Sequence, residues 1–120
     1  MKKIVFVVDD SVSNLTVAAE KLDPYYVVMT IPSGKKAIML LEKVIPSLIL
    51  LDIEMPEMDG FDVLKYLKSF EKFKDIPVIF LTARTDTQTE IDALKMGVVD
   101  FIPKPFNPTA LLNRVKQYVD

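Results

Sequence analysis

Residues 47–61 read SLILLDIEMPEMDGF, and this stretch decides the fold. The run Leu48–Leu51 is apolar at every position rather than at alternate positions, which is typical of a strand buried on both faces. The run stops at Asp52 and gives way to an acidic loop. Apolar residues then recur at helical spacing, which predicts a helix over 61–70. A buried strand, a loop and an amphipathic helix in this order indicate one unit of a parallel α/β sheet.

The same unit recurs along the whole chain, where short apolar runs alternate with amphipathic stretches. We expect strands at residues 3–8, 26–31, 48–51, 78–81 and 99–102. We expect helices at residues 13–22, 35–44, 61–70, 86–96 and 108–119. This pattern predicts a single α/β domain over residues 1–120: a doubly wound, flavodoxin-like sheet of five parallel strands in the order 2-1-3-4-5, flanked by five helices.

Local signals support the helix ends. Ser11 or Ser13 can cap the first helix, and Gly97 suits the residue after the fourth. Asn107 and Pro108 are typical of the start of the fifth helix.

Composition limits the possible functions. The 120 residues suffice for one domain but not for two. A net charge of −2 and an isoelectric point near 5.1 argue against a nucleic-acid-binding surface. The chain has no cysteine and no histidine, which excludes thiolate nucleophiles and imidazole metal ligands. No apolar run reaches the ~18 residues of a membrane span, so we expect a cytoplasmic protein that does not bind membranes.

Polar side chains follow four of the apolar runs: Asp9, Asp10, Asp52, Thr82 and Lys104. The carboxyl ends of parallel strands share one edge of a sheet, where doubly wound folds bind their ligands. Three carboxylates, a hydroxyl and an ammonium would then meet in one cleft. This collection suits a divalent cation and a phosphoryl group, with Asp52 as a carboxylate nucleophile toward phosphorus.

Each of these residues also has a purely structural interpretation. Asp9 and Asp10 can form a turn or cap the following helix. Thr82 can be a packing residue, and Lys104 an exposed loop lysine, although Pro103 and Pro105 restrict its backbone. The carboxylates favour a metal site, because two of them ~4 Å apart repel by roughly 4 kcal/mol at an effective dielectric constant near 20. Oxygen-only ligands favour Mg²⁺.

Four motifs in register resemble the receiver domain of two-component response regulators, the family that includes chemotaxis receivers. They are VVDD at 7–10, LLDIEMPEMDGF at 50–61, LTA at 81–83 and DFIPKPF at 100–106. The resemblance covers essentially the whole chain. It implies that Asp52 is the phosphoacceptor, that Asp10 and Asp52 bind Mg²⁺ directly with the Glu54 backbone carbonyl, and that Asp9 acts partly through water.

The resemblance also implies roles for the remaining positions. Thr82 and Lys104 would contact the phosphoryl group, with the Ala83 backbone N–H nearby. Phe101 stands at the position of the switch aromatic, often a tyrosine, and would respond with Thr82 without a hydroxyl of its own. Glu54 and Arg84 occupy variable positions that tune the phosphoryl lifetime, and we expect them to pair across the mouth of the cleft.

The partners implied are a sensor histidine kinase or histidine phosphotransfer protein, and a downstream effector or fused output domain. The output surface would be the face formed by residues 86–96, 99–102 and 108–119. The chain would catalyse only its own phosphorylation and dephosphorylation. Two alternatives fit less well. An aspartate-nucleophile phosphatase of the haloacid dehalogenase type needs DxDx[TV] where this chain reads DDSVS at 9–13, and an interaction module that has lost phosphorylation would not need all five site residues.

Overall fold

The computed structural model describes residues 1–84 and 86–120. In this part of the chain the strands are Ile4–Val8 (β1), Val27–Ile31 (β2), Leu48–Asp52 (β3), Val78–Thr82 (β4) and Asp100–Pro103 (β5). The helices are Val12–Leu22 (α1), Gly34–Leu41 (α2), Gly60–Lys68 (α3), Thr87–Lys95 (α4) and Pro108–Val119 (α5).

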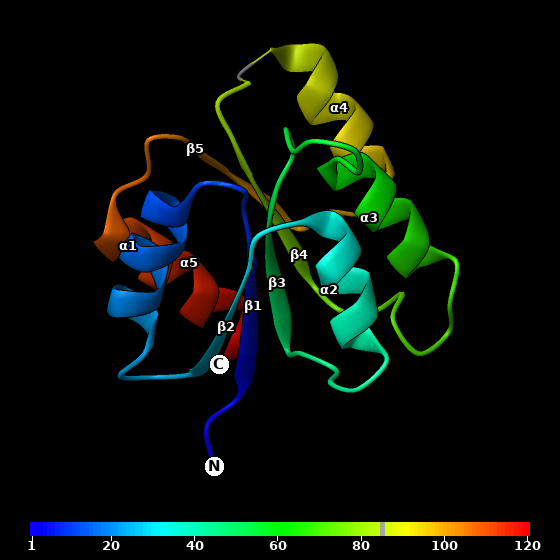
Figure 1. Cartoon of the computed structure of the whole chain (residues 1–120). Coiled ribbons are helices and arrows are strands. Elements are labelled where there is room, and N and C mark those ends of the chain that lie inside the picture. The colour runs from blue at the N-terminus through cyan, green and yellow to red at the C-terminus, as the bar shows by residue number, and fades with distance from the viewer. Residues whose placement is uncertain (85) are drawn as a thin grey trace.

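The strands form one parallel sheet in the order β2-β1-β3-β4-β5, which confirms the doubly wound topology predicted from the sequence. Helices α1 and α5 pack together on one face of this sheet, and α2, α3 and α4 lie on the other (Figure 1). The strand order reverses between β1 and β3, so the edge beyond their carboxyl ends is where this fold binds ligands.

The sheet is buried because both of its faces are covered by helices. Every residue of β3 and of β4 is buried, as their unbroken apolar runs predict. Alternation along β1 sends Val5 and Val7 to the core beneath α1 and α5, while Phe6 and Val8 pack beneath α2 and α3.

Several element ends differ from the sequence-based expectation, for reasons visible in the hydrogen bonds. Ser11 rather than Ser13 caps α1, because its hydroxyl accepts from the Asn14 N–H at 3.3 Å. Helix α2 ends at Leu41 rather than residue 44. The Glu42 and Lys43 N–H groups donate to carbonyls three residues back, at 3.3 and 2.9 Å, which replaces the α-helical pattern with a tighter turn.

Helices α3 and α4 have acidic caps that shift their starts. Asp59 and Asp62 form a capping box, so α3 begins at Gly60 and closes at Ser69. Asp86 is the N-cap of α4 rather than its first residue, and Gly97 follows that helix with a φ of 97°, as its sequence position predicts. The strand ends move by one residue, which places Asp52 within β3 and Thr82 within β4.

Candidate functional site

The predicted site residues lie at one edge of the sheet. Asp52 and Thr82 are the last residues of β3 and β4, and Asp9 follows β1 directly. Parallel pairing aligns these ends, because Val8 is opposite Leu51 and Asp52 is opposite Leu81.

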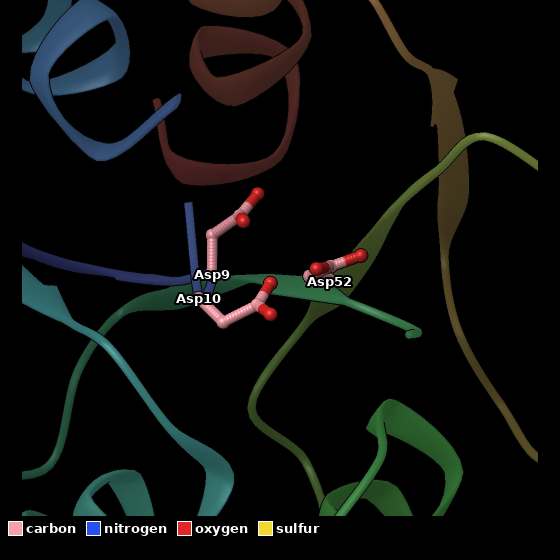
Figure 2. A group of neighbouring side chains, drawn as sticks. All are labelled: Asp9, Asp10 and Asp52. Atoms are coloured by element: carbon pink, nitrogen blue, oxygen red, sulfur yellow. The ribbon is translucent and has the colours of Figure 1, made fainter. Parts of the chain in front are cut away.

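The three aspartates converge. Asp9, Asp10 and Asp52 each offer a carboxylate oxygen, and these oxygens lie within 4.8 Å of one another (Figure 2). Asp9 is fully buried and Asp52 is 2% exposed, whereas Asp10 faces solvent. The sequence-based expectation that these carboxylates share one cleft is therefore met in the structure.

Lys104 reaches into the same cluster from the end of β5. Its Nζ lies 2.8 Å from Asp9 Oδ2 and 3.0 Å from Asp52 Oδ1. The Lys104 N–H donates to the Thr82 carbonyl at 2.8 Å, and the Lys104-Pro105 peptide bond is cis. The structural alternative of an exposed loop lysine is therefore wrong, because only 16% of this side chain is exposed.

The cluster perturbs the acid–base behaviour of its members. Burial raises the pKa of the Asp52 carboxyl to about 6, opposed by its hydrogen bond from Lys104 and assisted by the negative charge of Asp9. Burial acts to lower the pKa of the Lys104 ammonium, but hydrogen bonds to Asp9 and Asp52 outweigh it, so this pKa is raised. The lysine therefore stays charged while Asp52 remains mostly ionised at pH 7.

Asp9 has further partners that the sequence reading missed. Its Oδ1 accepts from the Ser11 N–H at 2.9 Å, and its Oδ2 accepts from the Asn14 side-chain amide at 3.2 Å. Asn14 stands five residues after Asp9 on the first turn of α1, a spacing that could have signalled the contact. These bonds fix the carboxylate at the start of α1.

Thr82 ends β4 next to Asp52 on β3, and Arg84 follows two residues later. The Thr82 hydroxyl accepts from the Arg84 N–H at 2.8 Å. The Arg84 Nε lies 3.9 Å from Glu54 Oε1, the pair expected across the cleft mouth, and 3.6 Å from Asp86 Oδ1. Asp86 as a second partner of Arg84 was not anticipated, because the sequence reading assigned that residue only to a helix.

Gly60 closes the loop that follows Asp52. Its N–H donates to the Ile53 carbonyl at 2.8 Å, and a Cβ at this position would come within 2.7 Å of the Asp52 carbonyl oxygen. The structural role expected for Asp59 and Gly60, as turn and helix start, is therefore confirmed.

The donor set suits a hard divalent cation. All of the clustered ligand atoms are carboxylate oxygens, and three carboxylates exceed the single Lys104 ammonium in charge. Magnesium prefers one or two carboxylates together with water, which an exposed Asp10 beside a buried Asp52 can provide. The residues present therefore fit a metal ion.

Comparison with known proteins identifies the family. The family model described as the response regulator receiver domain matches residues 5–116. The chain belongs to the response regulator receiver domains. This assignment confirms the family resemblance and disfavours the haloacid dehalogenase alternative. Receiver domains of this family act in two-component signal transduction.

Solved receivers have the same fold. The chemotaxis protein CheY4 of Vibrio cholerae is 29% identical, with a TM-score of 0.92, and the alignment covers 98% of this chain and 99% of that one. The BeF3-activated receiver domain of DrrB is 30% identical, with a TM-score of 0.88 and coverage of 98% and 97%. The response regulator DrrB of Thermotoga maritima is likewise 30% identical, with a TM-score of 0.88 and coverage of 98% of this chain and 52% of that one.

Curated relatives are mostly longer proteins. A probable cyclic di-GMP phosphodiesterase of Vibrio cholerae is 36% identical over 115 residues, which is 96% of this receiver and 26% of that protein. A probable transcriptional regulator of Cyanophora paradoxa is 36% identical over 96% of this receiver and 47% of its own length. The receiver thus spans less than half the length of these relatives. Among its described residues, no helix has the length and apolar character needed to cross a membrane.

Proposed function

We propose that this receiver accepts a phosphoryl group on Asp52 and transmits the change to a partner. The observation that carries the proposal is the position of Asp52, a buried carboxylate bonded to Lys104 at 3.0 Å within a group of three acids. Lys104 Nζ and the Glu54 N–H both contact Oδ1 of Asp52, which fixes the carboxylate and balances its charge, so Oδ2 is the oxygen proposed to attack.

The chain's own groups support an in-line transfer from phosphohistidine. A carboxylate oxygen of Asp52 attacks phosphorus, the P–N bond to the donor imidazole breaks, and its electron pair returns to the ring nitrogen. Lys104 balances charge on the transferring group, and the Thr82 hydroxyl donates to one of its oxygens. These 120 residues contain no histidine, so the donor histidine lies outside them.

We further propose Mg²⁺ as the cofactor, held by Asp10, Asp52 and the Glu54 backbone carbonyl, with Asp9 contributing through water. The ion would neutralise negative charge on the phosphoryl oxygens. Support comes from the oxygen-only cluster and its excess of negative charge.

Thr82 and Phe101 are the proposed switch pair. A cavity of about 190 Å³ lies between them, lined also by Arg84, Asp86 and Glu90. Phosphorylation replaces the single negative charge of the Asp52 carboxylate with a phosphoryl group that carries roughly two negative charges and three acceptor oxygens. The Thr82 hydroxyl would turn toward these oxygens, and the ring of Phe101 would move into the space that it leaves.

The proposed donor is a sensor histidine kinase or a histidine phosphotransfer protein. The proposed output is a downstream effector or a fused domain acting through α4, β5 and α5. Helix α4 supports this assignment, because its only buried side chains are Thr89 and Ala93, so little packing holds it in place. Catalysis limited to its own phosphorylation and dephosphorylation, and a cytoplasmic location, stay predictions.

Incubation with acetyl phosphate and Mg²⁺ tests the function. Intact-mass measurement should find one added phosphoryl group on the wild type and none on Asp52→Asn. A matched control is Asp75→Asn, which changes an exposed aspartate outside the cluster and should be modified like the wild type. An unmodified wild type, or a modified Asp52→Asn, contradicts the proposal.

A further inference from the structure

Three aromatic rings form a continuous stack behind the site. The rings of Phe101 and Phe80 have centroids 5.9 Å apart and planes at 70°, and those of Phe80 and Phe61 are 5.3 Å apart, also at 70°. Both contacts are edge-to-face, the geometry that aromatic pairs favour. Phe80 and Phe101 are also direct neighbours in the β4–β5 register, so the first contact is built into the sheet.

The middle ring has no room to move alone. Phe80 is fully buried, and its Cε1 lies only 3.2 Å from the place that a Cβ on Gly60 would occupy. It is thus confined by Phe101 on one side and by Phe61 and the backbone at Gly60 on the other. Close-packed interiors transmit displacement rather than absorb it.

The stack connects two different hollows of the surface. Phe101 lines the 190 Å³ cavity that also contains Thr82. Phe61 lines a groove of about 430 Å³ with Lys65, Asp92, Lys95 and Met96. This second hollow, which we term the α3–α4 groove, lies where the end of α4 approaches the first half of α3. Both helices are on the same face of the sheet (Figure 1).

We propose that Phe80 is a positioning residue that couples the Phe101 side chain to Phe61, so that phosphorylation of Asp52 reshapes the α3–α4 groove. The inference rests on the proposed function, because Phe101 must respond to the state of Asp52. If the Phe101 ring rotates, it loses its edge-to-face contact with Phe80 unless the Phe80 ring moves with it. The Phe80 ring cannot move in this way without displacing Phe61. Because α4 buries so few side chains, its wall of the groove can yield.

Methyl NMR of methionine tests this coupling without a partner protein. Met96 lines the groove, and Met39 is a distant reference on α2 that is 62% exposed. Addition of beryllium fluoride and Mg²⁺ to the wild type should shift the Met96 methyl resonance and leave Met39 unchanged. In Phe80→Leu the Met96 response should fall by at least half, while the Thr82 amide resonance still responds.

Phe73→Leu is the matched control. Phe73 is a buried phenylalanine of the same core cluster, but its ring contacts are with Tyr66 and Phe70 rather than with the stack. This variant should keep the full Met96 response. If Phe80→Leu does not fold, Phe80→Met retains more side-chain length and serves in its place.

The outcomes separate the two proposals. A Met96 response of wild-type size in Phe80→Leu, or an equal loss in Phe73→Leu, overturns the coupling and leaves phosphoryl acceptance standing. A wild type in which Thr82 itself does not respond contradicts the proposed function, and the coupling falls with it.

Discussion

At Asp52, burial and the charge of Asp9 oppose ionisation, whereas attack on phosphorus requires the ionised form. The Lys104 ammonium contacts the carboxylates of both Asp9 and Asp52, and its positive charge favours the ionised form of Asp52. A pKa of about 6 is the net result. The nucleophile is therefore ionised at neutral pH yet less well stabilised than a solvated carboxylate.

The raised pKa of Asp52 makes a prediction about stability. The folded pKa is about 6 and the ordinary value is 3.8, so the folded state holds this proton more tightly than the unfolded state. The contribution to the free energy of unfolding is fully present below pH 3.8 and is lost as pH rises through 6. Two pKa units correspond to about 3 kcal/mol, an upper bound for this group.

Asparagine does not ionise, so Asp52→Asn removes the loss of folding stability that ionisation of Asp52 causes. In EDTA at pH 7, we expect the variant to be more stable than the wild type by about 1–3 kcal/mol in urea unfolding. The difference should shrink between pH 6 and pH 4. Asp75→Asn, at an exposed site, should follow the wild type. A less stable Asp52→Asn at pH 7 would contradict the assigned electrostatics.

Arg84 and Glu54 make a kinetic prediction at the mouth of the cleft. Both side chains are about half exposed or more, so their pairing at 3.9 Å contributes little to stability. Their value would lie in screening phosphorylated Asp52 from water. We expect Arg84→Ala to hydrolyse its phosphoryl group several-fold faster than the wild type, with the free energy of unfolding changed by less than about 0.5 kcal/mol.

Phosphoryl lifetime is measured by the decay of the modified mass after acetyl phosphate is removed. Lys74→Ala is the control, because Lys74 pairs with Glu71, and neither residue belongs to the acidic cluster or lines the cavity beside Thr82. Equal decay rates in Arg84→Ala, Glu54→Ala and the wild type would refute the screening role.

At the scale of elements, the start of α3 fixes the Asp52 backbone. A Cβ at Gly60 would collide with the Asp52 carbonyl oxygen at 2.7 Å and with Ile53 Cα at 2.8 Å. Both of these are backbone atoms, so no side-chain rotation relieves the contact. We expect Gly60→Ala to lose about 1–3 kcal/mol of stability and to be phosphorylated more slowly, as mass measurements over time will report.

Gly34→Ala separates the two effects. A Cβ there meets Val63 Cγ2 at 2.8 Å and the Met58 carbonyl at 3.0 Å, which is also crowded but does not involve Asp52. It should lose stability yet keep the wild-type phosphorylation rate. If both variants slow the reaction equally, the effect of Gly60 is one of general stability.

The sequence predicted which segments form strands and helices, because apolar runs and helical spacing are visible in it. It predicted the first and last residues of these elements less well. The apolar runs of β3 and β4 are buried throughout, as their composition predicts. Helix α2 ends early because the Glu42 and Lys43 N–H groups bond to carbonyls three residues back instead of four, which no residue type signals. The contact of Asp86 with Arg84 was not predictable either, since the direction of each side chain depends on the backbone path of the loop.

At the scale of the whole molecule, the topology gathers residues that are far apart in the sequence. The parallel order β2-β1-β3-β4-β5 brings the carboxyl ends of β1, β3 and β4 to one edge. The site was predictable because strand ends and strand order suffice to place Asp9, Asp52 and Thr82 there. The ring stack from Phe101 to Phe61 was not, because ring contacts depend on side-chain orientation within each layer.

Metal binding should therefore stabilise the whole fold, because the acidic cluster exists only when the ends of β1 and β3 lie side by side. A ligand that binds the folded state alone adds about 2.7 kcal/mol at one hundred times its dissociation constant. We expect Mg²⁺ to raise the midpoint of thermal unfolding of the wild type in a concentration-dependent way. Calcium should do so less effectively if the site requires the smaller ion.

Asp10→Asn distinguishes binding at the cluster from a general salt effect. Asp10 is exposed, so its substitution removes a metal ligand and one repelling charge without opening the core. The metal-free variant should match or exceed the wild type in stability, while its response to Mg²⁺ should be largely lost. Asp23→Asn, at the exposed end of α1, should retain the full response. If the Mg²⁺ effect persists in Asp10→Asn, the metal binds outside this cluster. The charge balance proposed at Asp52 would then be wrong as well.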